Sequence, residues 1–109
     1  MRVLLAEDEE DLNFIITQKL RSEGYSVDSC YDGEEALDAL AVVDYDAIIL
    51  DIMMPEKDGL STCREVREKY TFPILFLTAK TTENDKYMGF LSGGDDYLAK
   101  PFSYNELIS

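Results

Sequence analysis

Five short apolar runs divide this chain, and a segment long enough for one helix separates each run from the next. The runs are Val3–Ala6, Ser26–Cys30, Ala47–Leu50, Ile74–Leu77 and Tyr97–Ala99. Short strands that alternate with helices indicate βαβ units and a parallel sheet. The third run is apolar at successive positions, as a strand must be when helices cover both faces of its sheet. We therefore predict an α/β, doubly wound fold with five parallel strands between two layers of helices.

The segments between the runs carry apolar residues at helical spacing. The apolar face of the first expected helix holds Leu12, Ile15, Ile16 and Leu20. Asn13 falls among the polar residues on the other side, and Gly24 supplies the end of this helix. Two further helices are expected, one over Glu34–Leu40 and one from Leu60 to Arg67. These helices account for the connections between the first four strands.

The last two expected helices are less regular. The segment Glu83–Leu91 contains Gly89, so it gains little stability from its own helix propensity. Such a helix suits an element that must shift, but an ordinary marginal helix fits the same residues equally well. Ser103 and Glu106 form a capping-box pattern that starts a fifth helix, and the sequence ends three residues later. We therefore expect the fifth helix to be truncated.

The length and charge of the chain narrow the range of functions. A chain of 109 residues forms one domain, so residues 1–109 are expected to be a single unit. The net charge of −13 argues against a surface that grips nucleic acid or an anionic membrane, because both require cationic side chains. The absence of histidine excludes a histidine-based zinc site, a Ser-His-Asp triad and histidine phosphotransfer within this chain.

The apolar runs and the cysteines predict a cytoplasmic protein. No run approaches the ~20 residues that a membrane-spanning helix needs, and Val3–Ala6 is too short for the apolar part of a signal peptide. Cys30 and Cys63 lie far apart in the sequence and are expected to be reduced, packed thiols. A membrane is therefore not an expected partner.

Acidic residues follow two of the expected strands. Glu7 and Asp8 come directly after the first run, and Asp51 comes directly after the third. Ligands of a doubly wound sheet bind outside the carboxyl ends of its strands, so these carboxylates converge if the two strands are neighbours. Close carboxylates repel by about 4 kcal/mol per pair at an effective dielectric near 20, and a hard divalent cation such as Mg²⁺ removes this cost. Any one of these acids alone is more simply a helix cap or a solvated side chain.

Two further residues stand at the ends of expected strands. Thr78 follows the fourth run, and Lys100 follows the fifth. A carboxylate nucleophile, a metal, a hydroxyl donor and an ammonium group are together the parts needed to transfer a phosphoryl group to an aspartate. Thr78 or Lys100 alone would be an ordinary turn or surface residue. The conjunction of groups from four strands makes Asp51 the predicted phosphoacceptor.

These residues resemble the pattern of the response-regulator receiver domain of two-component signalling. The matching segments are Glu7-Asp8, Asp51-Ile52-Met53-Met54-Pro55, Asp58-Gly59, Leu77-Thr78-Ala79 and Lys100-Pro101-Phe102. They occur in order from one end of the chain to the other, so the resemblance covers the whole sequence. It implies a flavodoxin-like fold with the strand order 2-1-3-4-5.

The resemblance also implies how a metal would be held. Asp51 would be phosphorylated, and Asp8 and Asp51 would bind Mg²⁺ directly, with Mn²⁺ as an alternative ion. The backbone carbonyl of Met53 would be a third protein ligand. Glu7 would act mostly through water. The cofactor expected for this chain is therefore a divalent cation.

A second set of implied roles concerns the phosphoryl group and the switch. Thr78 and Lys100 would contact the phosphoryl oxygens, and the peptide bond between Lys100 and Pro101 would be cis. Tyr97 would change its rotamer as Thr78 moves towards the phosphate, so that the fourth helix and the fifth strand repack. Without the resemblance, Tyr97 is more simply a half-buried packing residue.

The resemblance implies a signalling switch rather than a classical enzyme. A sensor histidine kinase or an acyl phosphate would phosphorylate Asp51, and the domain would assist its own phosphorylation and dephosphorylation. The segment Asp95-Asp96-Tyr97-Leu98 is most like the subfamily with a winged-helix DNA-binding domain downstream, so DNA would be bound only through a domain outside this chain. That subfamily dimerises through the fourth helix, fifth strand and fifth helix, and the truncated helix leaves open whether a homodimer forms here. A stand-alone receiver that acts through protein–protein contacts is the alternative.

Three other classes of protein share parts of this pattern. A haloacid-dehalogenase-type phosphatase needs a second acid two residues after its nucleophile, where this chain has Met53. A flavodoxin-like flavin-binding module needs a phosphate-binding loop after the first strand, and the acidic segment Glu7–Glu10 would repel phosphate. A receiver-like domain that is not phosphorylated would be expected to lack one of the five site residues, and all five are present.

Overall fold

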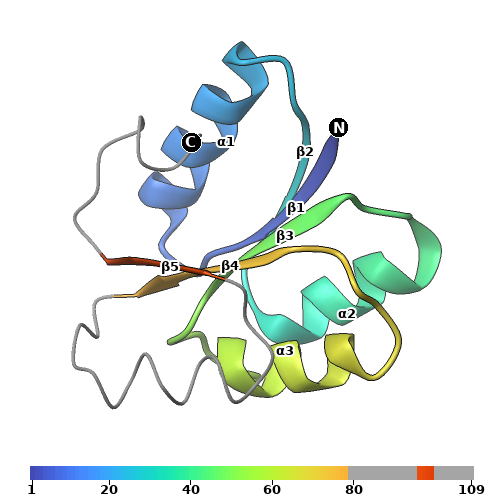
Figure 1. Ribbon diagram of the computed structural model, residues 1–109. Helices are drawn as coiled ribbons and strands as arrows, with labels where there is room; N and C mark the ends of the chain where they lie inside the picture. The colour runs from blue at the N-terminus through green and yellow to red at the C-terminus, as the bar shows by residue number, and fades with distance from the viewer. Residues whose placement is uncertain (79–95, 100–109) are drawn as a thin grey trace.

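The computed structural model describes residues 1–78 and 96–99, and it describes Thr78 and residues 96–99 by their backbone. Its elements are β1 (Arg2–Ala6), α1 (Glu10–Ser22), β2 (Ser26–Cys30), α2 (Gly33–Val42), β3 (Ala47–Asp51), α3 (Gly59–Arg67), β4 (Ile74–Thr78) and β5 (Asp96–Ala99). The strands form a central sheet, with α1 on one face and α2 and α3 on the other (Figure 1). The helices predicted over Glu83–Leu91 and from Ser103 onward lie outside the described residues.

Neighbouring strands of the sheet run parallel in the order β2-β1-β3-β4-β5. Val3 of β1 lies opposite Val27 of β2 and Ala47 of β3, so β1 is an interior strand. The backbone of β5 runs beside β4, with Asp96 opposite Leu75. A parallel sheet between helices, with β1 beside β3, confirms the predicted flavodoxin-like α/β fold. It also brings the carboxyl ends of β1 and β3 to the same edge.

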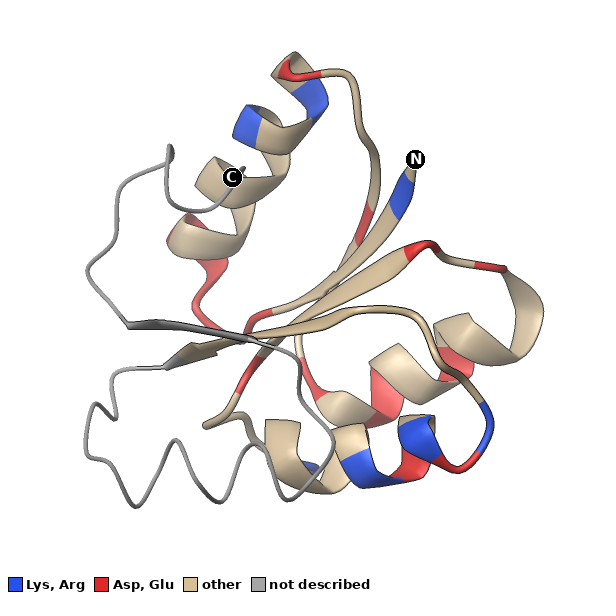
Figure 2. Cartoon of the chain, viewed as in Figure 1, with Lys and Arg blue, Asp and Glu red and all other residues tan. Residues whose placement is uncertain are grey.

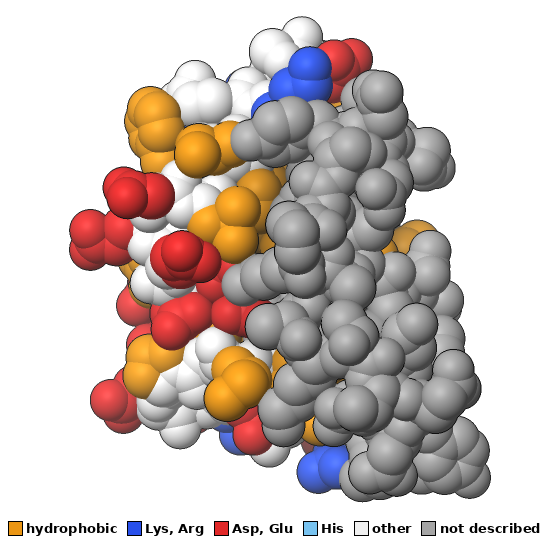
Figure 3. Space-filling model, turned by 90° about the vertical axis from the view of Figure 1, so that its left-hand side faces the viewer, with side chains coloured by type: hydrophobic (Ala, Val, Ile, Leu, Met, Phe, Trp, Pro, Cys, Tyr) orange, Lys and Arg blue, Asp and Glu red, His pale blue; other side chains and the backbone are white. Residues whose placement is uncertain are grey.

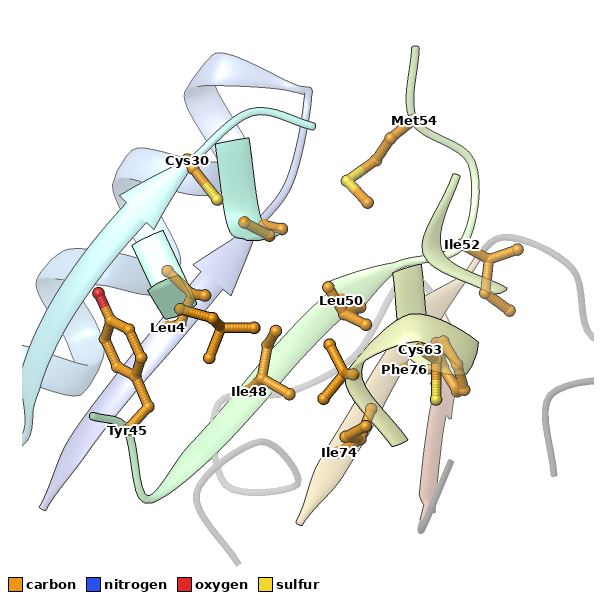
Figure 4. Close-up of a cluster of buried hydrophobic side chains, with 14 residues drawn as sticks. Leu4, Cys30, Tyr45, Ile48, Leu50, Ile52, Met54, Cys63, Ile74 and Phe76 are labelled. Carbon is orange, nitrogen blue, oxygen red and sulfur yellow. The ribbon is translucent and has the colours of Figure 1, made fainter. Parts of the chain in front are cut away.

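Both faces of the sheet are buried. Successive residues of a strand point to opposite faces, so Leu4 and Ile48 pack towards α2 and α3, while Leu5 and Ile49 pack towards α1. Figure 4 shows the cluster on the α2–α3 side, which includes Leu50, Ile52, Cys63, Ile74 and Phe76. Full burial of one such large side chain stabilises the fold by about 1.5–3 kcal/mol. The strands whose ends carry the acidic residues are therefore rigidly held.

Helix α1 buries a face that overlaps with the predicted one, since Ile16 and Leu20 are buried and Leu12 is partly buried. Its buried residues are Asn13, Ile16, Thr17 and Leu20. Ile15 is 44% exposed, so the prediction that Ile15 lies on the core side and Asn13 on the polar side was wrong. The cause is that polar Asn13 and Thr17 occupy two of the four positions facing the sheet. The helix ends as predicted, because Gly24 adopts a φ of 98° after the last turn.

Helices α2 and α3 each start at an aspartate that caps the first turn. Asp32 accepts a hydrogen bond from the amide nitrogen of Glu35 at 2.8 Å, and Asp58 accepts one from Ser61 at 2.8 Å. Caps of this kind satisfy backbone donors that the first turn leaves unpaired, and each contributes about 1 kcal/mol. They fix where each helix begins, and in α3 that point lies close to the end of β3.

A polar cluster near the amino-terminal ends of the strands joins β1, β2 and the start of β3. Arg2 donates from its guanidinium group to Asp28 Oδ2 at 2.7 Å, and the Tyr45 hydroxyl donates to the same oxygen at 2.7 Å. The hydrogen bond from Tyr45, assisted by Arg2, holds the pKa of Asp28 below its usual range. Burial, together with the hydrogen bond to Asp28, raises the pKa of Tyr45 to about 12. This cluster stabilises the end of the sheet opposite the acidic residues.

Candidate functional site

Glu7, Asp8 and Asp51 come together at the carboxyl edge of the sheet. Ala6 lies opposite Leu50 in the β1–β3 pair, so Glu7 and Asp51 follow at adjacent positions. One carboxylate oxygen from each of the three acids lies within 4.8 Å of the other two. Glu7 and Asp51 are buried, and Asp8 is exposed. Figure 2 shows acidic segments where β1 leads into α1 and where β3 ends. The convergence predicted from the sequence is therefore observed.

Mutual repulsion of these carboxylates opposes their convergence, and a bound cation would offset that repulsion. At an effective dielectric near 20, two carboxylates at this separation repel by about 3–4 kcal/mol. Acidic side chains also gather on the side of the molecule that lies at the left of Figure 1, and on the described part of that surface basic side chains lie only at the top and bottom (Figure 3). Such a surface attracts small cations. Carboxylate oxygens are hard ligands, so the donor set fits Mg²⁺ or Mn²⁺.

The turn between β1 and α1 is held by backbone and side-chain hydrogen bonds. The Glu7 amide nitrogen donates to the carbonyl oxygen of Cys30 at 3.1 Å, which extends the pairing of β1 with β2 beyond the strand ends. The Glu9 amide nitrogen donates to Glu7 Oε2 at 3.3 Å. The side-chain nitrogen of Asn13 donates to the carbonyl oxygen of Glu7 at 3.0 Å. Glu7 is therefore fixed both through its backbone and through its carboxylate.

The loop after β3 brings the start of α3 against the backbone of Asp51. The amide nitrogen of Gly59 donates to the Ile52 carbonyl oxygen at 2.9 Å. A Cβ atom at residue 59 would lie 2.2 Å from the Asp51 carbonyl oxygen, so this approach requires glycine. Within the loop Glu56 adopts a φ of 63°, a region that residues other than glycine rarely occupy. Asp58 and Gly59 thus act structurally: one caps α3 and the other allows its first turn to contact Asp51.

Two other predicted site residues are placed by their backbone. Thr78 is the last residue of β4, one position beyond Leu77, which lies opposite Asp51 in the sheet. Tyr97 of β5 lies opposite Phe76. The end of β4 therefore reaches the same edge of the sheet as the acidic cluster.

The remaining predicted site residues are Met53, Lys100 and Pro101. Met53 follows β3, and its side chain is 59% exposed. Lys100 and Pro101 lie outside the described residues. The contact of Lys100 with a phosphoryl group and the cis peptide before Pro101 therefore stay predictions, as does the metal-binding role of the Met53 carbonyl.

Asn13 is a residue of this site that the sequence interpretation missed. Its side chain is 1% exposed and contacts the backbone of Glu7 and Cys30. The available signal was its position three and seven residues before Ile16 and Leu20, which places it on the buried face of α1. A buried polar side chain must find hydrogen-bond partners, and the ends of β1 and β2 supply carbonyl oxygens.

This chain is similar to known proteins that have the same fold. A family model described as the response regulator receiver domain matches residues 3–109. The receiver domain of the Francisella response regulator 1452 is 38% identical, over 98% of this chain and 89% of its own, with a TM-score of 0.93. The BeF3-activated N-terminal receiver domain of Klebsiella pneumoniae RstA is 27% identical, over 99% and 92%, with a TM-score of 0.94. The chemotaxis response regulator CheY4 of Vibrio cholerae is 32% identical, over 98% and 92%, with a TM-score of 0.93.

This chain belongs to the response regulator receiver domain family. Receiver domains are phosphoacceptor signalling domains of two-component systems; sensor histidine kinases phosphorylate them, and they bind Mg²⁺ at an acidic pocket. The group formed by Glu7, Asp8 and Asp51 is an acidic pocket that could bind a metal. Among the helices of the described residues, none has the length and apolar character to cross a membrane.

Proposed function

We propose that this chain is a phosphorylation-dependent switch in which Asp51 accepts a phosphoryl group from a sensor histidine kinase or a small acyl phosphate. The observation that carries the proposal is the buried carboxylate of Asp51, which lies within 4.8 Å of carboxylate oxygens from Glu7 and Asp8. Three converging acids at the ligand-binding edge of a parallel sheet therefore favour a cation-dependent site.

Four residues would hold the cation. Asp8 and Asp51 would bind Mg²⁺ or Mn²⁺ directly, the Met53 carbonyl oxygen would be a third ligand, and Glu7 would act mostly through water. When bound, the ion neutralises negative charge on the phosphate oxygens. The contribution of the chain is to keep these oxygen atoms at fixed positions, two of them on buried carboxylates.

In the transfer step a carboxylate oxygen of Asp51 forms a bond to phosphorus while the bond from phosphorus to the donor breaks. The leaving group is the imidazole of a phosphohistidine or the carboxylate of an acyl phosphate, and it keeps the bonding electron pair. Thr78 donates a hydrogen bond to one phosphoryl oxygen, and the ammonium group of Lys100 neutralises charge on the group. Water later hydrolyses the acyl phosphate, and the domain assists both steps.

The phosphoryl group changes the shape of the domain through Thr78 and Tyr97. The new oxygens and charge draw Thr78 towards Asp51, and the space it leaves is filled by Tyr97. A shift from about 1% to about 99% of the active shape requires ~5.5 kcal/mol. A few charge-assisted hydrogen bonds of about 1.5–3 kcal/mol each supply that difference. The proposal includes a cis peptide bond between Lys100 and Pro101.

The output is a downstream winged-helix DNA-binding domain that controls transcription. The similarity to RstA supports only a domain downstream of the receiver, because the matching part of that protein is described as N-terminal. In this proposal the chain itself does not contact DNA, and any homodimer would form through the fourth-helix and fifth-strand face. The similarity to CheY4, a chemotaxis response regulator, supports the alternative of a stand-alone receiver acting through protein–protein contacts.

The proposed location is the cytoplasm. Cys30 and Cys63 are both buried, and no disulfide bond joins them, as expected where thiols stay reduced. Burial raises the pKa of the Cys30 thiol to about 12, with the nearby acids Glu35 and Asp32 acting in the same direction. A thiol with so high a pKa is unreactive at neutral pH.

Incubation with acetyl phosphate and Mg²⁺, followed by intact mass measurement, tests the proposal. The unsubstituted chain should gain the mass of one phosphoryl group, and the gain should disappear with EDTA. Asp51→Asn should gain none, whereas Asp38→Asn, which changes an exposed acid of α2, should behave as the unsubstituted chain. The proposal is wrong if the unsubstituted chain gains no mass or if Asp51→Asn gains as much.

A further inference from the structure

Asn13 uses its whole side-chain amide inside the structure. Its Nδ2 atom donates to the carbonyl oxygens of Glu7 at 3.0 Å and of Cys30 at 2.9 Å. Its Oδ1 atom accepts a hydrogen bond from the Thr17 hydroxyl at 3.3 Å. With only 1% of its surface exposed, Asn13 cannot exchange these partners for water.

The two carbonyl groups that Asn13 binds belong to the ends of different strands. Glu7 directly follows β1, and Cys30 is the last residue of β2. The Cys30 carbonyl oxygen also accepts the hydrogen bond from the Glu7 amide nitrogen at 3.1 Å. The side chain of Asn13 therefore ties the first turn of α1 to both strand ends at the point where the acidic residues begin.

The start of α1 relies on the hydrogen bonds of Asn13, because it lacks the side-chain cap that fixes the starts of α2 and α3. Glu9, at the N-cap of α1, makes no side-chain capping hydrogen bond, whereas Asp32 and Asp58 cap the other two helices. The turn that carries Glu7 and Asp8 thus lacks the usual device for fixing a helix start. Asn13, the fourth residue of the helix, supplies a substitute for that cap.

We propose that Asn13 is a positioning residue for the acidic site, which holds Glu7 and Asp8 in the arrangement that a divalent cation requires. The three converging carboxylates repel one another, and this repulsion favours opening of a loosely held turn. The hydrogen bonds of Asn13 oppose that opening and reduce the reorganisation needed for binding. The inference rests on the proposed function, because it assumes that Glu7, Asp8 and Asp51 bind a cation.

The side chain of Asn13 carries no charge, which suits it to a position beside three carboxylates. An amide offers two donors to two carbonyl oxygens and adds no charge. An aspartate of the same shape would place a fourth negative charge next to the cluster and would lose both donors. Substitution by leucine keeps a similar volume but removes both donors, so Asn13→Leu separates hydrogen bonding from packing.

The test is the dissociation constant of Mg²⁺, measured by calorimetry well below the melting temperature of every variant. Asn13→Leu should raise this constant by about tenfold or more, as loss of an outer partner of a metal ligand does. Thr17→Val, which frees only Asn13 Oδ1, should raise it by less. The control is Leu40→Ala, which lowers stability from α2 on the opposite face of the sheet and should leave the constant unchanged. Amide signals of Glu7 and Asp8 during the titration show whether the turn itself responds.

The positioning role is refuted if Asn13→Leu binds Mg²⁺ as the unsubstituted chain does, or if Leu40→Ala weakens binding as much. Should Asn13→Leu fail to fold, an unchanged constant in Thr17→Val refutes it instead. An unsubstituted chain that does not bind Mg²⁺ refutes the proposed function as well. Normal binding by the unsubstituted chain and by Asn13→Leu refutes the positioning role alone.

Discussion

Gly59 lies so close to Asp51 that a Cβ atom at residue 59 would stand 2.2 Å from the Asp51 carbonyl oxygen. The same hypothetical atom would lie 2.9 Å from the Cα atom of Ile52. Both neighbours are backbone atoms and cannot rotate away as a flexible side chain would. The start of α3 and the end of β3 therefore pack directly against each other, and Asp51, which carries the carboxylate, lies at this contact.

Gly59→Ala should destabilise the fold and impair the site together. The added methyl group forces the backbone of Asp51 or of α3 to move, and overpacking of this kind costs about 1–3 kcal/mol. Urea unfolding measures the loss, and acetyl phosphate labelling measures the site. Ser61→Ala, on the same first turn, is the control and should change neither. A Gly59→Ala variant as stable as the unsubstituted chain would contradict the close contact.

Glu56 offers a substitution expected to stabilise the protein. A left-handed conformation costs an ordinary L-residue roughly 1 kcal/mol, and asparagine tolerates it better. Glu56→Asn should therefore raise the free energy of unfolding by about 0.5 kcal/mol, whereas β-branched Glu56→Val should lower it. Thermal unfolding of the two variants side by side checks the sign. Equal effects in the same direction would show that the φ of 63° carries no strain.

Tyr45 should give the protein an alkaline stability limit. Its pKa is raised to about 12, chiefly by burial, above the ordinary value near 10. A raised pKa in the folded state contributes stability that is present below pH 10 and lost as the pH rises towards 12. Tyr45→Phe should be less stable than the unsubstituted chain at pH 7, because it lacks the hydrogen bond to Asp28. The difference should shrink between pH 10 and 12, which urea unfolding at several pH values would show.

Asp28 should limit the stability of the folded protein in acid, as Tyr45 does in alkali. The hydrogen bond from Tyr45 lowers its pKa, so its contribution is present above the ordinary value near 4 and is lost as the pH falls below it. Asp28→Asn should therefore weaken the acid dependence of stability. Asp38→Asn is the comparison, since Asp38 is exposed on α2. Identical acid unfolding of Asp28→Asn and the unsubstituted chain would count against this contribution.

Asp8→Asn should have opposite effects with and without a divalent cation. Without Mg²⁺ it removes repulsion from Glu7 and Asp51 and should raise the free energy of unfolding by about 1–2 kcal/mol. With Mg²⁺ the unsubstituted chain should gain stability by binding, and Asp8→Asn should gain less. Melting temperatures in EDTA and in a series of Mg²⁺ concentrations show both effects. A lower melting temperature of Asp8→Asn in EDTA would argue against repulsion at the site.

The fold and the acidic cluster follow from regular features of the sequence. Strand runs that are apolar at successive positions predict burial on both faces, and the alternation of Leu4 and Leu5 between two clusters shows it. Once β1 and β3 are neighbours, the acids that follow them must meet. The three carboxylates could therefore be predicted from their positions in the sequence.

Other parts of the site could not be predicted, because they depend on contacts between segments far apart in the sequence. The prediction was wrong for Ile15 and Asn13 of α1, because residue type was given more weight than position along the helix. Ile15 is apolar and was assigned to the core face, whereas Asn13 is polar and was assigned to the solvent face. No feature of the sequence around Asn13 shows that the carbonyl oxygens of Glu7 and Cys30 would accept its hydrogen bonds. Likewise, glutamate rarely adopts a left-handed conformation, so the sequence does not predict the positive φ of Glu56.

The position of β1 between β2 and β3 has a consequence for how the protein folds. Val3 lies opposite Ala47, so the pair closes a long loop, whereas β1 and β2 join over a much shorter one. Loop-closure entropy makes the β1–β3 pairing the less favourable of the two to close, by about 0.5 kcal/mol for a loop nearly twice as long. Because Asp8 and Asp51 meet only across that pair, a nascent chain has no cation site until its central strands have joined. The moment at which a refolding chain begins to bind a cation would therefore report when β1 and β3 pair.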